Sequence, residues 1–184
     1  SIQVKLNHFT LVGATTRLGQ ISSPLRSRFG LNVKLDYYPA DDLIDILERT
    51  SHLLNLKIDR NSIKCIASRS RGTPRIANNL LKWVRDFVMV KRSGVVDEEG
   101  VQQALNLLQI DEKGLDETDK RILRVLIEHH RGGPTGLNTI AASIGEEAST
   151  IEEVHEPYLI MQGFLNRTPR GREVTDLAYK HMRD

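Results

Sequence analysis

The sequence has a single cysteine, Cys65, and few aromatic residues, which make up 5% of its 184 residues. One thiol excludes a disulfide-stapled scaffold and a cysteine-based metal cluster. Apolar runs are only a few residues long, far short of the roughly 20 residues of a membrane-spanning helix. The first residues also lack the charged-then-apolar pattern of an export signal. We therefore expect a cytoplasmic protein that does not interact with a membrane.

Common catalytic motifs are missing as well. The sequence has no G-x-x-x-x-G-K-[ST] phosphate loop and no apolar strand ending in paired acids that would hold magnesium. His129 and His130 are adjacent, so on a helix their side chains diverge instead of meeting at one metal ion. No serine or cysteine nucleophile lies in a recognisable strained turn. Taken alone, the chain is expected to be no enzyme and to hold no metal.

What is present is an ordinary globular composition with an uneven charge. Apolar residues make up 39% and charged residues 27%, which excludes a disordered or fibrous chain. Residues 1–114 contain 17 lysines and arginines against 12 acids, whereas residues 115–184 contain 9 against 12. Yet this acidic part contains a six-residue stretch, residues 167–172, that carries Arg167, Arg170 and Arg172 and no acid. A basic cluster of this kind is a local signal that the net charge of +2 hides.

The N-terminal part has the pattern of a buried strand. His8–Thr16 is mostly apolar and ends in small and polar residues, which is typical of a strand in a parallel sheet. Leu31–Leu35 adds at most one more short strand. Because one strand is not stable alone, residues 1–38 are interpreted as the C-terminal remnant of a larger α/β domain.

Residues 39–111 have helical apolar spacing. Asp41 or Asp42 is predicted to cap the first helix, while Thr73 and Pro74 suit the N-cap and first position of the third. The apolar residues that mark four helices are Leu43, Leu47 and Leu54, then Ile63, Ile66 and Ala67, then Ile76 to Val88, then Val101 to Leu108. Four helices with short connections predict a small bundle.

Residues 112–184 begin in a polar connector, Asp111–Gly114, where we place a domain boundary. The predicted elements are helices around Ile122–Ile127, over Leu137–Ile144 and from Thr150 to Met161, and strands over Gly163–Asn166 and Glu173–Thr175. Pro157 should kink or shorten the third helix. Three helices followed by a hairpin predict a winged helix.

Three polar clusters suggest phosphate binding. Thr16 ends the predicted strand, where a hydroxyl is able to position a water or a phosphate. The alternative, which the residues alone favour, is a strand-end turn with threonine as a local cap. Arg26 and Arg28 lie between the apolar anchors Leu25 and Phe29, an arrangement that could hold a guanidinium towards a phosphate. The alternative interpretation is a pair of solvated surface arginines. Arg75 falls in the first turn of a helix, where a phosphate is favoured and a cation alone is not.

The fourth cluster is the predicted loop Arg167–Arg172. Pro169 and Gly171 shape a tight turn, from which the three arginines are expected to project towards one surface. Such a wing binds a phosphate backbone without reading the bases. The acidic start of the preceding helix, Ser149–Glu153, argues against base readout, because acids repel phosphates. A solvated turn remains the alternative.

Five segments together closely resemble the RuvB family, the AAA+ motors of Holliday-junction branch migration. They are FTLVGATTR, SSPLRSRFG, RSRGTPRIANNLL, GGPTGLNTIAASIGEE and EPYLIMQGFLNRTPRGR, in this order along almost the whole chain. The family's N-terminal portion, with its Walker A and B motifs, has no counterpart here. The resemblance implies a mainly α fold with small β elements: a remnant of the AAA+ α/β core over residues 1–38, a four-helix lid over 39–111 and a winged helix over 112–184.

The resemblance also implies a role for each candidate residue. Thr16 corresponds to sensor 1, and Arg28 to the arginine finger that reaches the ATP of a neighbouring subunit, with Arg26 a weaker candidate for that task. Arg75 corresponds to the sensor-2 arginine, and Tyr38 lines the adenine pocket with Pro74 nearby. The DNA-contacting residues of the wing are Arg167 and Arg172, with Arg170 between them.

The function implied is that of an ATP-driven DNA translocase in recombination and repair. The resemblance implies ATP and Mg²⁺ as cofactors, with the magnesium ligands outside this chain. It also implies double-stranded DNA or a Holliday junction, a homo-hexamer and a junction-binding, RuvA-like protein as partners. An initiator-type AAA+ protein and a stand-alone winged-helix DNA-binding protein are the alternatives. The chain itself is expected to be inactive, since it lacks Walker A and B.

Overall fold

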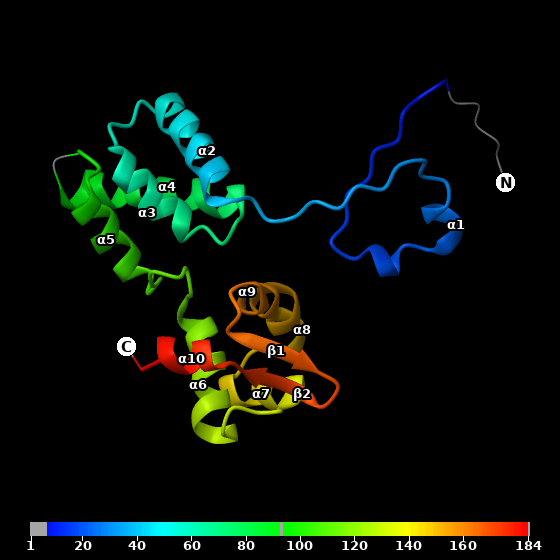
Figure 1. Ribbon diagram of the computed structural model, residues 1–184. Helices are drawn as coiled ribbons and strands as arrows, with labels where there is room; N and C mark the ends of the chain where they lie inside the picture. The colour runs from blue at the N-terminus through cyan, green and yellow to red at the C-terminus, as the bar shows by residue number, and fades with distance from the viewer. Residues whose placement is uncertain (1–6, 93, 184) are drawn as a thin grey trace. The chain divides into compact units, whose positions relative to one another are not determined.

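The structure is a computed structural model, and it describes residues 7–92 and 94–183. The chain divides into two compact units, Ser1–Asp36 and Tyr37–Asp184. Its α-helices and strands are labelled in Figure 1. In the described stretches no helix combines the length and the apolar character that crossing a bilayer requires.

The first unit contains short helical turns and no strand within residues 7–36. Its elements are the 3₁₀ helix η1 (Leu18–Gln20) and the helix α1 (Ser23–Arg26). The predicted strands over His8–Thr16 and Leu31–Leu35 are therefore wrong: both stretches are irregular and exposed. A strand must pair its N–H and C=O groups with a neighbouring strand, and residues 7–36 provide none. The apolar side chains that suggested a strand stay more than half exposed, among them Phe9, Leu11 and Val12.

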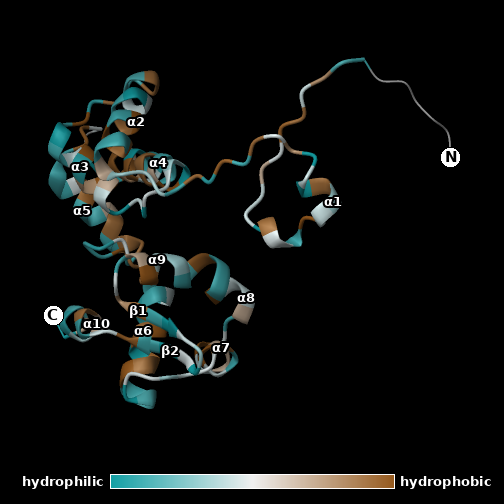
Figure 2. Ribbon diagram, turned by 45° about the vertical axis from the view of Figure 1, so that its right-hand side comes forward, coloured by the Kyte–Doolittle hydropathy of each residue, from teal (hydrophilic) through white to brown (hydrophobic). Residues whose placement is uncertain are grey.

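The second unit begins with the predicted four-helix bundle. Its helices are α2 (Ala40–Leu53), α3 (Arg60–Ser68), α4 (Pro74–Lys91) and α5 (Glu98–Leu107). Helix α2 packs on α3 and α4, and α5 packs on the same two helices. Their apolar residues form one core around Leu47, Ile66, Val84 and Leu105, all without exposed surface. Figure 2 shows hydrophobic and hydrophilic stretches within each of these helices, as expected of amphipathic helices.

Helix starts in the bundle differ in part from the prediction. Asp41 and Asp42 lie in the first turn of α2, where the helix dipole favours acids, and Pro39 occupies the N-cap position. Thr73 is at the N-cap position of α4, as predicted, and Pro74 is at its first position. The Thr73 hydroxyl, however, donates to the Arg71 carbonyl at 3.2 Å and does not cap the helix.

Residues 112–183 confirm the predicted order of three helical segments and a hairpin. The elements are α6 (Glu117–His130), α7 (Leu137–Ile144), α8 (Ala148–Thr150), the π-helical turn η2 (Ile151–His155), α9 (Glu156–Met161), β1 (Leu165–Thr168), β2 (Gly171–Val174) and α10 (Asp176–His181). Helix α10 was not predicted. The π turn ends two residues before Pro157, because the proline ring cannot accommodate regular α-helical hydrogen bonding.

The hairpin is tighter than the sequence suggested. Strands β1 and β2 pair antiparallel, with Arg167 opposite Arg172, so the turn consists of Pro169 and Arg170 alone. The expected loop over Arg167–Arg172 is therefore mostly strand. Beneath it lies a second core, separate from that of the four-helix bundle, in which Leu115, Leu126, Ile140 and Phe164 are at most 1% exposed.

Candidate functional site

The first unit holds Thr16 and Arg28. Thr16 is an exposed residue at a bend, next to Thr15, whose hydroxyl oxygen accepts a hydrogen bond from the Arg17 N–H at 2.9 Å. The ring of Phe29 lies against Gly13, so that a Cβ built there would be 3.5 Å from the ring carbon Cζ. This contact brings the segment that carries Thr16 alongside the segment that carries Arg28.

Arg28 follows a short, internally bonded turn. The backbone N–H of Arg28 donates to the Leu25 carbonyl at 3.1 Å, and the Ser27 hydroxyl donates to the Pro24 carbonyl at 3.1 Å. The side chains of Arg26 and Arg28 are both exposed, and neither has an ion-pair partner among the described residues. The turn thus presents two guanidinium groups free to bind an anion.

The second unit brings Tyr38, Pro74 and Arg75 together. The Tyr38 N–H donates to the Gly72 carbonyl at 2.8 Å, two residues before α4 begins at Pro74. Gly72 has a φ of +64°, and a Cβ there would lie 2.7 Å from the Tyr37 Cβ, so this approach requires glycine. Tyr37 and Tyr38 are both about half exposed.

Arg75 is exposed in the first turn of α4, and no described carboxylate pairs with it. No side chain caps the helix at this end. Its first turn also carries no acid. Free N–H groups, the positive end of the helix dipole and a guanidinium thus meet at one place, which favours a phosphate.

The wing arginines differ sharply in their surroundings. Arg172 is 12% exposed and forms a two-point contact with the Glu156 carboxylate, from its Nε at 3.0 Å and its Nη2 at 2.9 Å. Arg167 is 56% exposed and contacts Glu152 Oε1 at 2.9 Å and Glu156 Oε1 at 3.4 Å. Arg170, at the turn, is 80% exposed, and its one ion-pair contact with a described residue is with Glu173, at 3.9 Å.

The expectation that all three arginines project from the hairpin is therefore wrong for Arg172. Directly opposed residues of an antiparallel pair point to the same face of the sheet, and on that face Arg167 and Arg172 meet the two glutamates. The acidic segment Ser149–Glu153 was expected to form a surface that repels phosphates, and this pairing with the arginines was not predicted. The spacing of Glu152 and Glu156, four residues apart, was the available signal, because such residues share one side of a helix.

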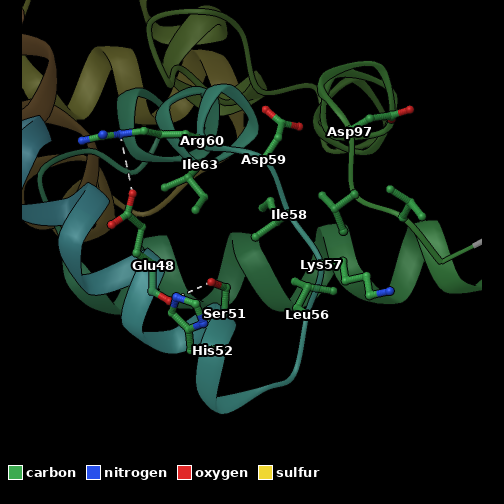
Figure 3. A pocket seen from close by; sticks show the side chains of 12 residues that line it. Glu48, Ser51, His52, Leu56, Lys57, Ile58, Asp59, Arg60, Ile63 and Asp97 are labelled. Atoms are coloured by element: carbon green, nitrogen blue, oxygen red, sulfur yellow. Dashed lines mark hydrogen bonds and ion pairs between the residues drawn. The ribbon is translucent and has the colours of Figure 1, made fainter.

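A separate pocket lies within the four-helix bundle. Figure 3 shows Glu48 and Arg60 facing each other at its edge. The Arg60 Nε lies 3.6 Å from the Glu48 Oε1. Asp59, on the same pocket, caps α3. Hydrogen bonds from the Ser62 hydroxyl and then the Ser62 N–H hold the pKa of Asp59 below its usual value. None of the predicted site residues is among the described residues that line this pocket.

Three family models match the chain in succession. Residues 1–35 match the Holliday junction DNA helicase RuvB P-loop domain. Residues 38–111 match the RuvB AAA lid domain, and residues 112–183 match the RuvB C-terminal winged helix domain. Together the three matches account for almost the whole sequence.

Individual relatives agree with these models. The chain is 62% identical over 182 residues to the Holliday junction branch migration complex subunit RuvB of Protochlamydia amoebophila, covering 99% of this chain and 55% of that protein. It is 54% identical to the subunit of the same name from Parabacteroides distasonis, covering 99% of this chain and 53% of that one. The chain therefore spans about half the length of the relatives it matches.

Solved structures give the same result. The structure of the Thermotoga maritima RuvB Holliday junction branch migration motor superimposes with a TM-score of 0.88 at 52% identity, covering 95% of this chain and 59% of that one. The matched models, the relatives and the shared fold agree along the whole sequence. This chain belongs to the RuvB family.

Proposed function

We propose that this chain is part of an ATP-driven DNA translocase that drives Holliday-junction branch migration in recombination and repair. The observation that carries the proposal is the presence of two exposed arginines, Arg28 and Arg75. Each is held at a short ordered turn, and neither has a carboxylate partner among residues 7–92 and 94–183. An unpaired guanidinium on a constrained backbone is suited to a phosphate, because its planar fork is permanently charged.

In this proposal Arg75 binds the phosphates of ATP in its own subunit, and Tyr38 and Pro74 lie against the adenine. Arg28 acts as the arginine finger of the neighbouring subunit in a homo-hexamer. Thr16 serves as sensor 1 and orients the attacking water or the γ-phosphate. The phosphate loop and the ligands of Mg²⁺ lie outside these 184 residues, so the chain alone is inactive.

DNA is bound by the wing, with Arg170 as the exposed contact and Arg167 as a second. Arg172 supports them from its buried position beside Glu156. Contacts of this kind read phosphates and leave the bases unread, which suits a motor that must move along any sequence. The whole protein is expected to act at a Holliday junction with a junction-binding, RuvA-like partner.

The deciding experiment uses the complete protein that contains this chain. Arg28→Ala should bind ATP normally, while its hydrolysis rate falls by about 10³–10⁵. Mixing it with a subunit whose phosphate loop is disabled should restore hydrolysis, because the second subunit supplies the missing arginine. Arg49→Ala, which removes an exposed arginine of α2, is the control and should keep full activity. Absence of rescue contradicts a role across subunits.

A further inference from the structure

The turn between α3 and α4, Ser70–Thr73, connects to three parts of the second unit. It is closed by a hydrogen bond from the Thr73 N–H to the Ser70 carbonyl at 3.0 Å. Its Gly72 carbonyl holds the Tyr38 backbone, and its C-terminal end leads into Pro74 and Arg75. The remaining residue, Arg71, points towards the winged helix.

Arg71 adopts a left-handed backbone conformation, with a φ of +54°. This conformation is unfavourable for a residue with a Cβ, so surrounding contacts must hold it. The Arg71 side chain is 12% exposed, although arginine is among the residues least often buried. Both features indicate that the side chain is bound to specific partners.

Those partners all belong to the winged helix. Arg71 Nη1 lies 3.1 Å from Asp119 Oδ2, and Nη2 lies 3.4 Å from Asp119 Oδ1. Its guanidinium carbon is 4.3 Å from the centre of the Tyr158 ring. Nη1 also reaches Asp116 Oδ2 at 3.4 Å, and Nη2 donates to the Val154 carbonyl at 3.4 Å. The Arg71 guanidinium is therefore held both by a two-nitrogen contact with the Asp119 carboxylate and by a cation–π contact with Tyr158.

The receiving carboxylate is itself fixed in place. Asp119 has no exposed surface, and it forms a capping box with Asp116 through N–H to Oδ contacts of 3.0 and 2.9 Å. His155 Nδ1 lies 2.8 Å from Asp119 Oδ1. Asp116, Asp119 and His155 have a spacing that suits a metal ion. Because Arg71 already supplies a positive charge to this cluster, we interpret Asp116, Asp119 and His155 as the binding site of the Arg71 side chain.

The surrounding junction leaves little room for movement. The Tyr158 hydroxyl donates to the Lys113 carbonyl at 2.6 Å. At Gly114, a Cβ would lie 2.9 Å from the Arg69 carbonyl oxygen and 3.0 Å from the Tyr158 hydroxyl. Burial raises the pKa of Tyr158 to about 12, so its phenol remains a donor across the physiological range. The turn and the winged helix are thus joined by a packed, hydrogen-bonded contact.

We propose that Arg71 is a positioning residue that couples the occupancy of the nucleotide site to the orientation of the winged helix. The same short turn holds Tyr38, leads into Arg75 and docks Arg71 onto Asp119. A shift of this turn on nucleotide binding is therefore passed to the DNA-binding wing. The proposal rests on the proposed function for the identity of the nucleotide, whereas the docking of Arg71 is independent of it.

The docking is tested on the 184-residue chain itself. Spin labels at Lys82→Cys on α4 and Glu128→Cys on α6, in a Cys65→Ser background, report the distance between bundle and winged helix by pulsed electron paramagnetic resonance. We expect one narrow distance peak, which Arg71→Ala abolishes. Arg71→Lys, a milder change, should also broaden the peak, because an ammonium lacks the planar fork. An unchanged peak in both variants overturns the proposal.

The matched control is Arg92→Ala. Arg92 is likewise bound to two carboxylates, those of Asp97 and Glu99, but entirely within the four-helix bundle. The peak should therefore remain narrow in this variant. Broadening in Arg92→Ala as well would mean that loss of any largely buried, ion-paired arginine loosens the chain, and it would contradict a specific role for Arg71.

The coupling is tested on the complete protein, by measuring duplex affinity with and without a non-hydrolysable ATP analogue. Coupled sites typically change each other's affinity by about 5- to 150-fold. In Arg71→Ala this ratio should fall towards one. A purely structural role would weaken both affinities and leave their ratio unchanged, which would overturn the proposal. If the intact protein fails to bind the analogue at all, the proposed function fails, while the spin-label result still decides the docking.

Discussion

Arg167 and Arg172 lie opposite each other in the β1–β2 hairpin, and both guanidinium groups contact the carboxylate of Glu156. That carboxylate is 3% exposed, so the base of the wing is an internally neutralised cluster. Arg170, at the turn, lies outside the cluster and is 80% exposed. Arginines that are only a few residues apart in sequence therefore have different tasks.

The first prediction concerns DNA binding by the turn. Arg170→Ala should weaken binding to unrelated duplexes alike, by about tenfold at low salt, because one charged phosphate contact is lost. The slope of log affinity against log salt concentration should flatten by about 0.9. Titrations of two unrelated duplexes at several salt concentrations measure both quantities. A loss confined to one sequence would indicate base readout.

The second prediction concerns stability. Arg172→Ala leaves the Glu156 carboxylate buried without its main partner, which should lower the free energy of unfolding by about 3–5 kcal/mol. Chemical denaturation measures this change, and Arg170→Ala serves as the exposed control with little effect. Equal losses in the two variants would contradict the division between a buried and an exposed arginine.

The third prediction follows from the competition between carboxylate and phosphate for Arg167. Glu152→Gln removes the charge that holds Arg167 at 2.9 Å, so Arg167 should bind DNA more readily and duplex affinity should rise several-fold. Glu128→Gln is the control, because it removes the same charge from an exposed position of α6. An equal rise in both variants would point to net charge as the cause.

The fourth prediction is a pH dependence at the start of α3. The pKa of Asp59 is lowered by the Ser62 hydrogen bonds, so its contribution is present above the usual aspartate pKa of about 3.9 and is lost as the pH falls below it. Asp59→Ala should reduce the free energy of unfolding by about 1 kcal/mol at pH 6. The difference from the unmodified chain should shrink towards pH 3. Asp45→Ala, an exposed residue of α2, should show neither effect.

The helices were predictable because their signals are local. The helix predicted over Leu137–Ile144 matches α7 residue for residue, with Gly145 at its C-cap in a left-handed conformation. Pro157 likewise marked the break in the third helix of the winged helix. Such signals act over one or two turns of the chain, so a reading of adjacent residues captures them.

The strand predicted over His8–Thr16 is wrong because local signals do not decide strand formation. Its apolar pattern is that of a strand, but strand formation depends on a neighbour that supplies hydrogen bonds. Residues 7–36 contain no such neighbour, and the backbone remains irregular. A pattern of this kind describes what a segment needs from its surroundings and not what it forms alone.

Arg71 and Glu156 were missed for a related reason. Arg71 is separated from Asp119 by 48 positions, and Arg172 from Glu156 by 16. No local spacing links such residues. The neighbours of each charge along the chain therefore identify the basic cluster but not its partners.

The sequence by itself determined the helical segments, the hairpin and the family, since periodicity, caps, turns and motif spelling are all carried by adjacent residues. Only the tertiary structure decided which arginines are available to an anion: Arg28, Arg75 and Arg170 are, whereas Arg71 and Arg172 are held by internal carboxylates. The physical reason is that a guanidinium binds whichever negative charge the fold places within a few ångströms, and that placement is a property of the packed chain.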